Sequence, residues 1–318
     1  MNETTDRAGE IPAFLVEAVE AAYGADDAIR ALEGVREAAD RPVTLRANAL
    51  KADAAQIARA LDEAGIEYDR RPWYEDAFVL DGVRERAVWD LDIYRDGKVY
   101  LQSLSSMLPP LALNPRTDAD ILDMCAAPGG KTSQIAALLG GAARLTACEM
   151  NGPRAEKLGY NLAKLGAKNV QVMRCDARKL DTFFSFDQIL LDAPCTGSGT
   201  VRAGDARAAR HMDARNLDRS VRSQRALLDR ALRVLKPGGE LLYSTCSILP
   251  AENEDQVAAA LARHRDCEIV PIALEGDWKT LPCGIEGALT VCPSREFEGF
   301  FMAKIKKDAK AGGRKRRP

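Results

Sequence analysis

Between residues 97 and 306, short apolar segments alternate with helical segments, and this alternation constrains the fold more than any other feature. Each apolar segment ends at a polar or glycine-rich turn, after which a helical pattern begins. Strands that alternate with helices pack as a mainly parallel sheet with helices on both faces, so we predict an α/β, Rossmann-like domain here. The predicted strands cover 99–101, 121–124, 144–148, 170–174, 188–191 and 240–244, and the predicted helices cover 105–113, 132–139, 153–165 and 218–235.

Residues 1–96 have a different pattern, which predicts a separate small α/β domain. A helical pattern runs from 11 to 39 with a break near Gly24. Asp53 can cap a further helix, because its side chain can accept a hydrogen bond from a free N–H at the helix start. The predicted strands of this region cover 42–46, 66–70 and 77–80.

The net charge of the chain is only −2, but its basic residues are concentrated in two segments. Residues 202–236 carry ten Arg or Lys and four Asp, and residues 304–318 carry eight Arg or Lys and one Asp. Local basic surfaces bind phosphate backbones, although a solvated helix face and a solubilising tail would have the same composition. We expect residues 307–318 to form a basic, disordered tail.

Some classes of protein and of site are not expected. The sequence contains no run of 18 or more apolar residues and no basic-then-apolar leader, so we expect a cytoplasmic protein without a membrane segment. The eight cysteines form no Cys-x-x-Cys pair, and His211 and His264 are the only histidines, so we expect no metal site. By default, most of these cysteines are small buried side chains.

A loop of small residues follows the predicted strand 121–124 and leads into a helix. Small residues allow a ligand to lie against the backbone, and the free N–H groups of a helix N-terminus favour a carboxylate. A P-loop would need glycine at position 125, where this chain has cysteine, which argues against an NTPase. The candidate cofactor residues of this loop are Cys125, Ala126, Ala127, Pro128, Gly129, Gly130 and Lys131.

Acidic residues end the next two predicted strands. Glu149 can accept hydrogen bonds from both hydroxyls of a ribose, and Asp176 can accept one from an adenine amino group. Strand ends are often acidic, so neither residue is specific alone. Together with the loop they fit a nucleoside that carries a small zwitterion, which is S-adenosylmethionine.

Two cysteines follow neighbouring strands of the predicted sheet. Cys195 lies in Asp192-Ala193-Pro194-Cys195, and Cys246 lies in Thr245-Cys246-Ser247, so we expect both thiols at one edge. A thiolate that adds to carbon 6 of cytosine activates carbon 5 toward a methyl donor. A second ionisable group can assist product release, and an acid such as Asp192 can bind the nitrogen edge of the base. The alternative is that both cysteines are packing residues.

These segments resemble the Sun-type (Nol/Nop/Sun) RNA cytosine-5 methyltransferase family over roughly residues 95–305, and more loosely from residue 40. The resemblance rests on 125–132, 192–199, 235–239, 245–247, 252–254 and 299–301. It implies a class I methyltransferase fold with a small RNA-recognition-like α/β domain at the N-terminus. Many relatives carry Pro-His shortly before Gly-Phe-Phe, whereas this chain has Cys292-Pro293-Ser294, which leaves local substrate contacts open.

The resemblance also implies roles for individual residues. Cys246 matches the nucleophile and Cys195 the cysteine that assists release, while Asp192 and Lys131 match the active-site aspartate and loop lysine. The residues that match the S-adenosylmethionine site are Cys125 to Lys131, Glu149, Arg154, Asp176 and Asp192.

The substrate implied by the resemblance is RNA, and we favour ribosomal over transfer RNA. Residues 1–95, the basic segment 202–236 and the tail would bind it, and we expect a monomer. A DNA cytosine-5 methyltransferase would use Cys195 as the nucleophile, and DNA enzymes lack a cysteine matching Cys246. A non-catalytic RNA-binding or ribosome-assembly factor is a further alternative. An amino-methyltransferase is disfavoured, since those enzymes usually have an Asn/Asp-Pro-Pro-aromatic turn where this chain has Asp192-Ala193-Pro194-Cys195.

Overall fold

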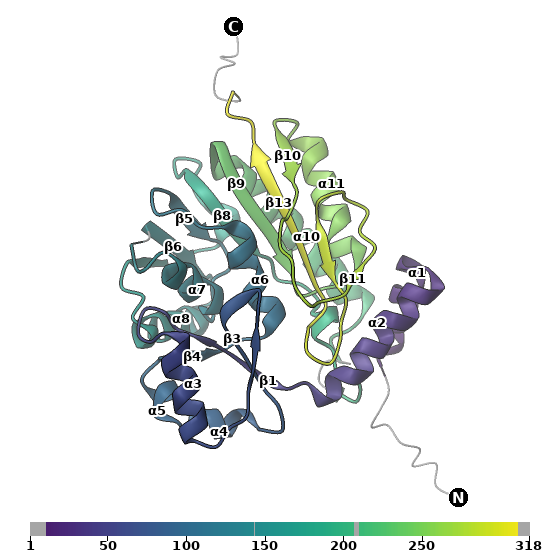
Figure 1. Cartoon of the computed structure of the whole chain (residues 1–318). Coiled ribbons are helices and arrows are strands. Elements are labelled where there is room, and N and C mark those ends of the chain that lie inside the picture. Colours follow the sequence, from purple (N-terminus) through teal and green to yellow (C-terminus); the bar gives the residue numbers. More distant parts are fainter. Residues whose placement is uncertain (1–10, 143, 207–209, 311–318) are drawn as a thin grey trace, which may run out of the picture.

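The computed structural model describes residues 11–142, 144–206 and 210–310, and nine of the described strands form one sheet (Figure 1). Five neighbours in this sheet are parallel, and they contain the predicted strands of the Rossmann-like region except 99–101, which pairs in a second, smaller sheet instead. In sheet order they are β7 (Val170–Met173), β6 (Arg144–Cys148), β5 (Asp120–Asp123), β8 (Phe186–Asp192) and β9 (Leu235–Thr245).

Antiparallel strands, which the sequence did not predict, extend the sheet beyond β9. The strand β13 (Phe300–Lys307) pairs with β9, so that Phe301 lies opposite Thr245 at the carboxyl edge of the sheet. The remaining antiparallel strands are β10 (Cys267–Val270), β11 (Thr280–Leu281) and β12 (Leu289–Val291).

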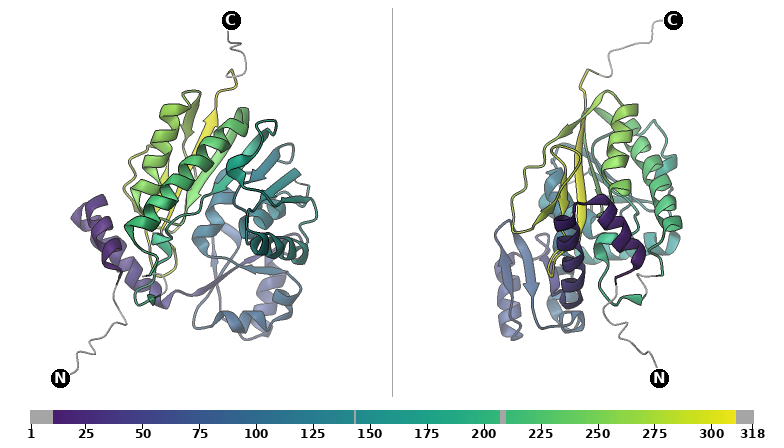
Figure 2. Two further views of the ribbon diagram at one scale, coloured as in Figure 1. Left: turned by 180° about the vertical axis from the view of Figure 1, so that it is seen from behind. Right: turned by 90° about the vertical axis from the view of Figure 1, so that its right-hand side faces the viewer.

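Helices cover both faces of the large sheet, as Figures 1 and 2 show from the front and from behind. Apolar side chains of α6 (Leu104–Leu113), α7 (Gly130–Leu138) and α8 (Gly152–Leu165) are buried against one face. Those of α10 (Ala214–Val234) and α11 (Glu254–Arg263) are buried against the other. The predicted fold class is therefore confirmed. Short 3-10 helices lie at η3 (Ala177–Lys179), η4 (Ser198–Thr200) and η5 (Pro250–Glu252).

The long helix α10 differs from its predicted range at the N-terminal end. It begins at Ala214, before the predicted residue 218, because the side chain of Asp213 accepts a hydrogen bond from the backbone N–H of Asn216 and caps the helix. At its other end the chain passes directly from Val234 into β9. The Pro-Gly-Gly segment at 237–239 therefore lies within the range of that strand.

A second, four-stranded antiparallel sheet lies at the lower left of Figure 1. The Asp53 cap is present, because Asp53 and Gln56 exchange hydrogen bonds at the start of α3 (Ala54–Glu63). The strand β4 (Val99–Leu101) pairs with β1, so this small sheet extends past residue 96. Its other strands are β1 (Val43–Ala47), β2 (Asp69–Arg71) and β3 (Tyr74–Leu80), and its short helices are α4 (Glu85–Trp89) and α5 (Asp92–Arg95).

The first two helices of the chain lie away from this small sheet, at the right of Figure 1. The helices α1 (Ala13–Ala22) and α2 (Ala25–Glu37), followed by η2 (Ala38–Asp40), are separated at the predicted break. Leu15 and Val35 are buried in one apolar cluster with Val201, Ile248 and Leu249 of the large domain. The predicted boundary between residues 96 and 97 stays a prediction.

Three further expectations concern the basic tail, membrane-spanning helices and metal sites. Residues 311–318 of the predicted tail and 207–209 of the basic segment lie outside the described residues, while Lys307 still belongs to β13 and pairs with Cys267. Within the described ranges, no helix has the length and hydrophobicity needed to cross a membrane. The same ranges contain no cluster of three or more His, Cys, Asp or Glu side chains with the arrangement of a metal site.

Candidate active site

The two candidate catalytic cysteines meet at the carboxyl edge of the large sheet. Asp192 at the end of β8 lies opposite Ser244 of β9 in parallel register, and the turns that follow carry Cys195 and Cys246. Their Sγ atoms are 3.1 Å apart, which confirms that both thiols lie at one edge. The hydrogen bond with Cys246 and burial raise the pKa of the Cys195 thiol well above its usual range. Cys195 is therefore a neutral thiol at pH 7.

A buried glutamate positions the turn that carries Cys195. Glu252 has no exposed surface, and its carboxylate accepts hydrogen bonds from the backbone N–H (2.8 Å) and the hydroxyl (2.6 Å) of Thr196. The side-chain amide of Gln224 donates to the same carboxylate at 3.1 Å and to the carbonyl of Pro194 at 3.0 Å. Charge-assisted bonds of this kind fix the geometry of a turn.

The next residue, Asn253, positions the turn that carries Cys246. Its side-chain oxygen accepts a hydrogen bond from the Thr245 hydroxyl, and its amide donates to the carbonyl of Ser247 at 2.9 Å. Two consecutive side chains thus hold the turns on both sides of the thiol pair. The family resemblance included residues 252–254 but implied no role for them.

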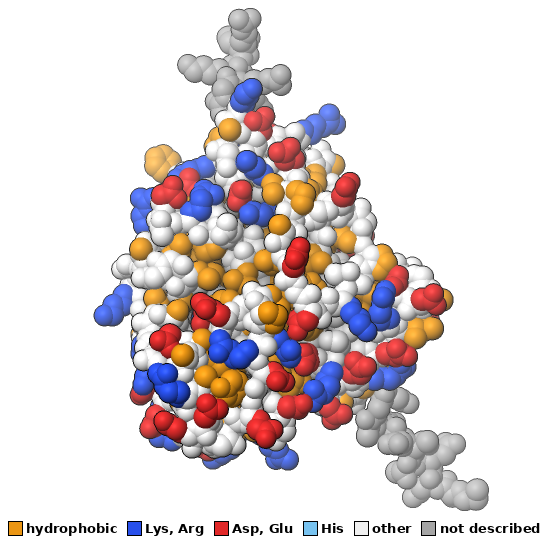
Figure 3. Space-filling view, in the orientation of Figure 1, with side chains coloured by type: hydrophobic (Ala, Val, Ile, Leu, Met, Phe, Trp, Pro, Cys, Tyr) orange, Lys and Arg blue, Asp and Glu red, His pale blue; other side chains and the backbone are white. Residues whose placement is uncertain are grey.

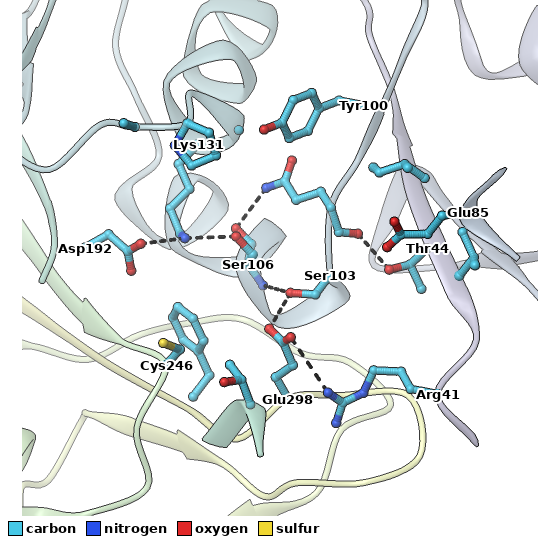
Figure 4. Close-up of a pocket in the computed structure, with 18 of the residues that line it drawn as sticks. Arg41, Thr44, Glu85, Tyr100, Ser103, Ser106, Lys131, Asp192, Cys246 and Glu298 are labelled. Carbon is cyan, nitrogen blue, oxygen red and sulfur yellow. Dashed lines mark hydrogen bonds and ion pairs between the residues drawn. The ribbon is translucent and has the colours of Figure 1, made fainter. Parts of the chain in front are cut away.

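An ion pair lies beside Cys246, as Figure 4 shows. The Lys131 ammonium donates to the carboxylate of Asp192 at 2.7 Å and to the hydroxyl of Ser106 at 2.9 Å. Ser244 donates to the second oxygen of Asp192 at 2.8 Å. Burial lowers the pKa of Lys131, but the charge and hydrogen bond of Asp192 outweigh it, so the pKa is raised and the side chain stays cationic. Ser106 and Ser244 were not predicted.

The ion pair and Cys246 line a cavity of about 650 Å³ between the small sheet and the large domain. This volume is in the range of ligand sites, and its walls carry many hydrogen-bonding groups. Tyr100 and Ser103 come from β4 and the start of α6, and Glu298 and Phe300 from the segment before and at β13. We call it the substrate cavity.

A second cavity, of about 690 Å³, lies on the other side of Asp192 along the ends of β6, β7 and β8. Glu149, Arg154, Asp176 and Cys195 line it, as predicted for a cofactor site beyond the ends of parallel strands. Asp192, Cys125, Ala127 and Cys246 line both cavities. We call the second one the cofactor cavity.

The predicted cofactor loop lies at the junction of these cavities. Gly129 adopts φ 107°, a left-handed conformation that favours glycine, and this turn allows α7 to begin at Gly130. Gly129 itself lines neither cavity. Its neighbours in the loop, Cys125, Ala126, Ala127, Pro128, Gly130 and Lys131, line the substrate cavity.

The acidic residues of the cofactor cavity are held by arginines. Arg154 lies 3.3 Å from the Glu149 carboxylate and donates to the carbonyl of Ala127 at 2.9 Å, so it connects the strand end to the loop. Arg178, which was not predicted, binds both oxygens of Asp176 at 2.9 Å, and this hydrogen bonding lowers the pKa of Asp176. Carboxylate oxygens accept more than one hydrogen bond, so both acids can still bind hydroxyl or amino groups.

Asp123, at the end of β5, is a further residue that the sequence did not single out for a role. It is 1 % exposed, and one carboxylate oxygen accepts a hydrogen bond from Thr132 at 2.7 Å while the other has no partner among the described residues. Burial raises its pKa to about 6. A buried carboxylate with a free oxygen at this junction suits a cationic ligand such as S-adenosylmethionine.

The strand order, the helices on both faces and the cavities at the carboxyl edge define the class I methyltransferase fold. The family described as 16S rRNA methyltransferase RsmB/F matches residues 110–306, more than half of the chain, and the protein belongs to that family. A ferredoxin-like domain described for the same family matches residues 11–85. The predicted Sun-type family and N-terminal α/β region are confirmed.

Relatives and solved structures agree with this assignment. The chain is 36% identical over 272 residues to ribosomal RNA small subunit methyltransferase F of Shewanella piezotolerans, covering 83% of this chain and 57% of that protein. It is 35% identical over 279 residues to the protein of the same name from Aeromonas salmonicida, again covering 83% and 57%. The chain thus spans less than two thirds of the length of these relatives.

Two solved structures share the fold over most of the chain. A methyltransferase homolog protein from Pyrococcus horikoshii has a TM-score of 0.78 and 33% identity, covering 92% of this chain and 93% of that one. NSun6 from Pyrococcus horikoshii has a TM-score of 0.80 at 24% identity, covering 93% and 98%.

Proposed function

We propose that the protein methylates carbon 5 of a cytosine in small-subunit ribosomal RNA, with S-adenosylmethionine as the donor and Cys246 as the nucleophile. The observation that carries the proposal is the place of Cys246. It lines both the substrate and the cofactor cavity, 3.1 Å from a second thiol and beside the Lys131–Asp192 ion pair. Family membership and the names of the relatives support ribosomal RNA.

The residues present suit S-adenosylmethionine, which would supply an electrophilic methyl group when bound. The cofactor cavity has the volume of a ligand site, and Glu149 and Asp176 supply acceptors for hydroxyl and amino groups. The carboxylates of Asp123 and Asp192 lie near the junction, where their negative charge would stabilise the positive charge of a sulfonium.

In the proposed reaction, the Cys246 thiolate forms a bond from Sγ to carbon 6 of cytosine, and the ring electrons move toward carbon 5. Carbon 5 forms the new bond to the methyl group as the bond from that methyl group to the sulfonium sulfur breaks, which leaves the donor as a neutral thioether. Asp192 and Lys131 form hydrogen bonds with the edge of the cytosine ring that carries its nitrogen and oxygen atoms. A base then removes the carbon 5 proton, the Cys246 Sγ–carbon 6 bond breaks, and the ring double bond re-forms.

Cys195 fits the release step for an electrostatic reason. The first cause of its raised pKa is the hydrogen bond with Cys246. When Cys246 is bonded to carbon it carries no negative charge, so the pKa of Cys195 falls. Cys195 can then pass its thiol proton to solvent and, as a thiolate, accept the carbon 5 proton during release.

The test compares wild type, Cys195→Ala and Cys246→Ala after incubation with small-subunit ribosomal RNA and S-adenosylmethionine. We expect Cys195→Ala to accumulate a denaturant-resistant protein–RNA adduct, because the bond between Cys246 and carbon 6 forms but is not broken again. Cys246→Ala should form none, and wild type should give 5-methylcytosine. Sequencing the attached RNA identifies the target.

Other outcomes would contradict the proposal. Adduct that accumulates only in Cys246→Ala would make Cys195 the nucleophile, as in a DNA-type enzyme. No adduct and no methylation, with cofactor binding intact, would favour the non-catalytic RNA-binding alternative.

A further inference from the structure

A small cavity of about 160 Å³ lies between β4, the edge strand of the small sheet, and α8 of the large domain. Tyr100, Leu101 and Pro128 line both this cavity and the substrate cavity, so the two are separated by a single wall of side chains. A second hollow shares Lys164 with this cavity and is also lined by Lys51, Asp96 and Lys98. We call this surface, lined by Tyr94, Lys51, Lys157 and Lys164, the lysine groove.

The positive charges of the lysine groove are not neutralised by acids. Among the described residues, no carboxylate forms an ion pair with Lys51, Lys157 or Lys164, and the nearby Asp96 is paired with Lys98 at 3.2 Å. The Lys51 ammonium instead donates to the carbonyls of Asp96 and Lys164, each at 2.7 Å. The groove therefore presents a local excess of positive charge in a protein whose net charge is −2.

Two of these lysines are held close together. Burial and the like charge of Lys51 lower the pKa of Lys164, whose ammonium lies 3.9 Å from the centre of the Tyr94 ring. Like charges held together without an acid between them attract an anion, because the anion relieves their repulsion. An ordinary solvated helix face would have its lysines spread apart or paired with acids.

We propose that the lysine groove binds the phosphate backbone of the RNA next to the target cytosine. The inference rests on the proposed function and adds the path of the strand. A nucleobase that occupies the substrate cavity leaves its sugar-phosphate chain outside that cavity, and the groove lies directly beyond Tyr100, which lines both. Lysines contribute phosphate contacts without base readout, so the groove orients the strand without selecting its sequence.

The main alternative path follows the basic face of α10, where Arg215 is exposed. Over the face shown in Figure 3, Lys, Arg, Asp and Glu are mixed, so charge alone marks no single RNA path on that face. The groove is favoured since it shares its walls with the substrate cavity. Arg219 and Arg222 of α10 instead line the cofactor cavity.

The test measures binding of transcribed small-subunit ribosomal RNA over a range of salt concentrations. The variants are Lys157→Gln with Lys164→Gln, Lys157→Gln alone, and Arg215→Gln, with Lys279→Gln as a matched control. Lys279 is an exposed lysine beside β11, on another side of the molecule. Lys157 is also exposed, so its single variant should fold normally.

Each lost phosphate contact should reduce the slope of log affinity against log salt by roughly 0.7 for single-stranded RNA, so the double variant should lose about twice the slope of Lys157→Gln. Methylation at saturating RNA should stay at the wild-type rate. An unchanged slope in both groove variants, or a loss confined to Arg215→Gln, would overturn the inference. In either case wild type would still produce 5-methylcytosine, whereas failure of wild type to methylate would contradict the proposed function itself.

Discussion

At the scale of single residues, Asp123 shows how burial changes a side chain that looks ordinary in the sequence. Its carboxylate is fully buried beneath the cofactor loop with one hydrogen bond, from Thr132. A folded-state pKa of about 6 lies above the unfolded value near 3.8, so the folded protein holds this proton more tightly. The stabilising contribution is therefore complete below pH 3.8 and is lost as pH rises through 6.

Asp123→Asn removes this titration while keeping an acceptor for Thr132. Relative to wild type, we expect the variant to gain stability as pH rises from 4 to 7, by at most roughly 3 kcal/mol. Urea unfolding of both proteins across this range measures the difference. Asp62→Asn, which changes an exposed carboxylate of α3, is the control. Parallel pH profiles for Asp123→Asn and wild type would contradict the assigned burial effect.

The sequence predicted the site residues whose type and position are unusual, and missed those defined by their neighbours. Asp192 ends a strand, and Cys195 and Cys246 lie in distinctive turns just after strands, so their proximity followed from parallel strand order. Ser106 and Ser244 are common residue types, and their roles depend on contacts with Lys131 and Asp192 across the fold. No local sequence pattern indicates such contacts.

At the scale of elements, η5 and the start of α11 determine how the two active-site turns face each other. Glu252 binds the turn after β8, and Asn253 binds the turn after β9. Both side chains are fully buried, so the bonds are shielded from water. We expect this arrangement to set the distance between the thiols.

Glu252→Gln keeps the shape of the side chain but replaces an acceptor oxygen with a donor. One of the two Thr196 donors then loses its acceptor, and we expect a loss of stability of about 1–3 kcal/mol. Adduct formation in the Cys195→Ala background should slow as well, because the turn is released. Glu156→Gln, on the exposed side of α8, should change stability by less than about 0.5 kcal/mol. Equal unfolding midpoints for the two variants would refute this role.

The elements that the sequence predicted are those with a clear period and clear ends. The parallel strands are apolar runs with abrupt polar ends, whereas β11 and β12 are very short and gain their structure from pairing, β12 with β13 and β11 with β12. Pairing between distant segments leaves little local pattern. The placement of α1 and α2 against the large domain depends on the same kind of long-range contact.

At the scale of the whole molecule, a few buried polar contacts join the small sheet to the large domain. Arg46 of β1 has no exposed surface and donates to Gln102 and to Ser133 of α7, each at 3.0 Å. Asn48, just after β1, is also fully buried, and its amide donates to the carbonyls of Gly97 at 2.8 Å and Leu165 at 2.7 Å. Since Leu165 ends α8, this one amide connects both parts of the fold.

The docking of the two parts shapes the substrate cavity, because Tyr100 and Leu101 of the small sheet line it together with residues of the cofactor loop. Asn48→Ala leaves the carbonyls of Gly97 and Leu165 without their donor in a buried place. We expect this variant to lose about 1–3 kcal/mol of stability and to bind RNA more weakly, while cofactor binding changes little. Urea unfolding and separate titrations with RNA and S-adenosylmethionine measure the three effects.

Asn169→Ala is the matched control, since Asn169 is exposed but also donates its amide to a backbone carbonyl, that of Gly141 at 2.7 Å. Water can replace an exposed donor, so this variant should lose less stability than Asn48→Ala. Equal losses in the two variants would mean that Asn48 acts only locally. A loss of cofactor binding as large as that of RNA binding would mean that the interface supports the large domain as a whole. The proposed coupling requires RNA binding to depend more strongly on Asn48, because the substrate cavity has walls from both parts, whereas the described walls of the cofactor cavity come from the large domain.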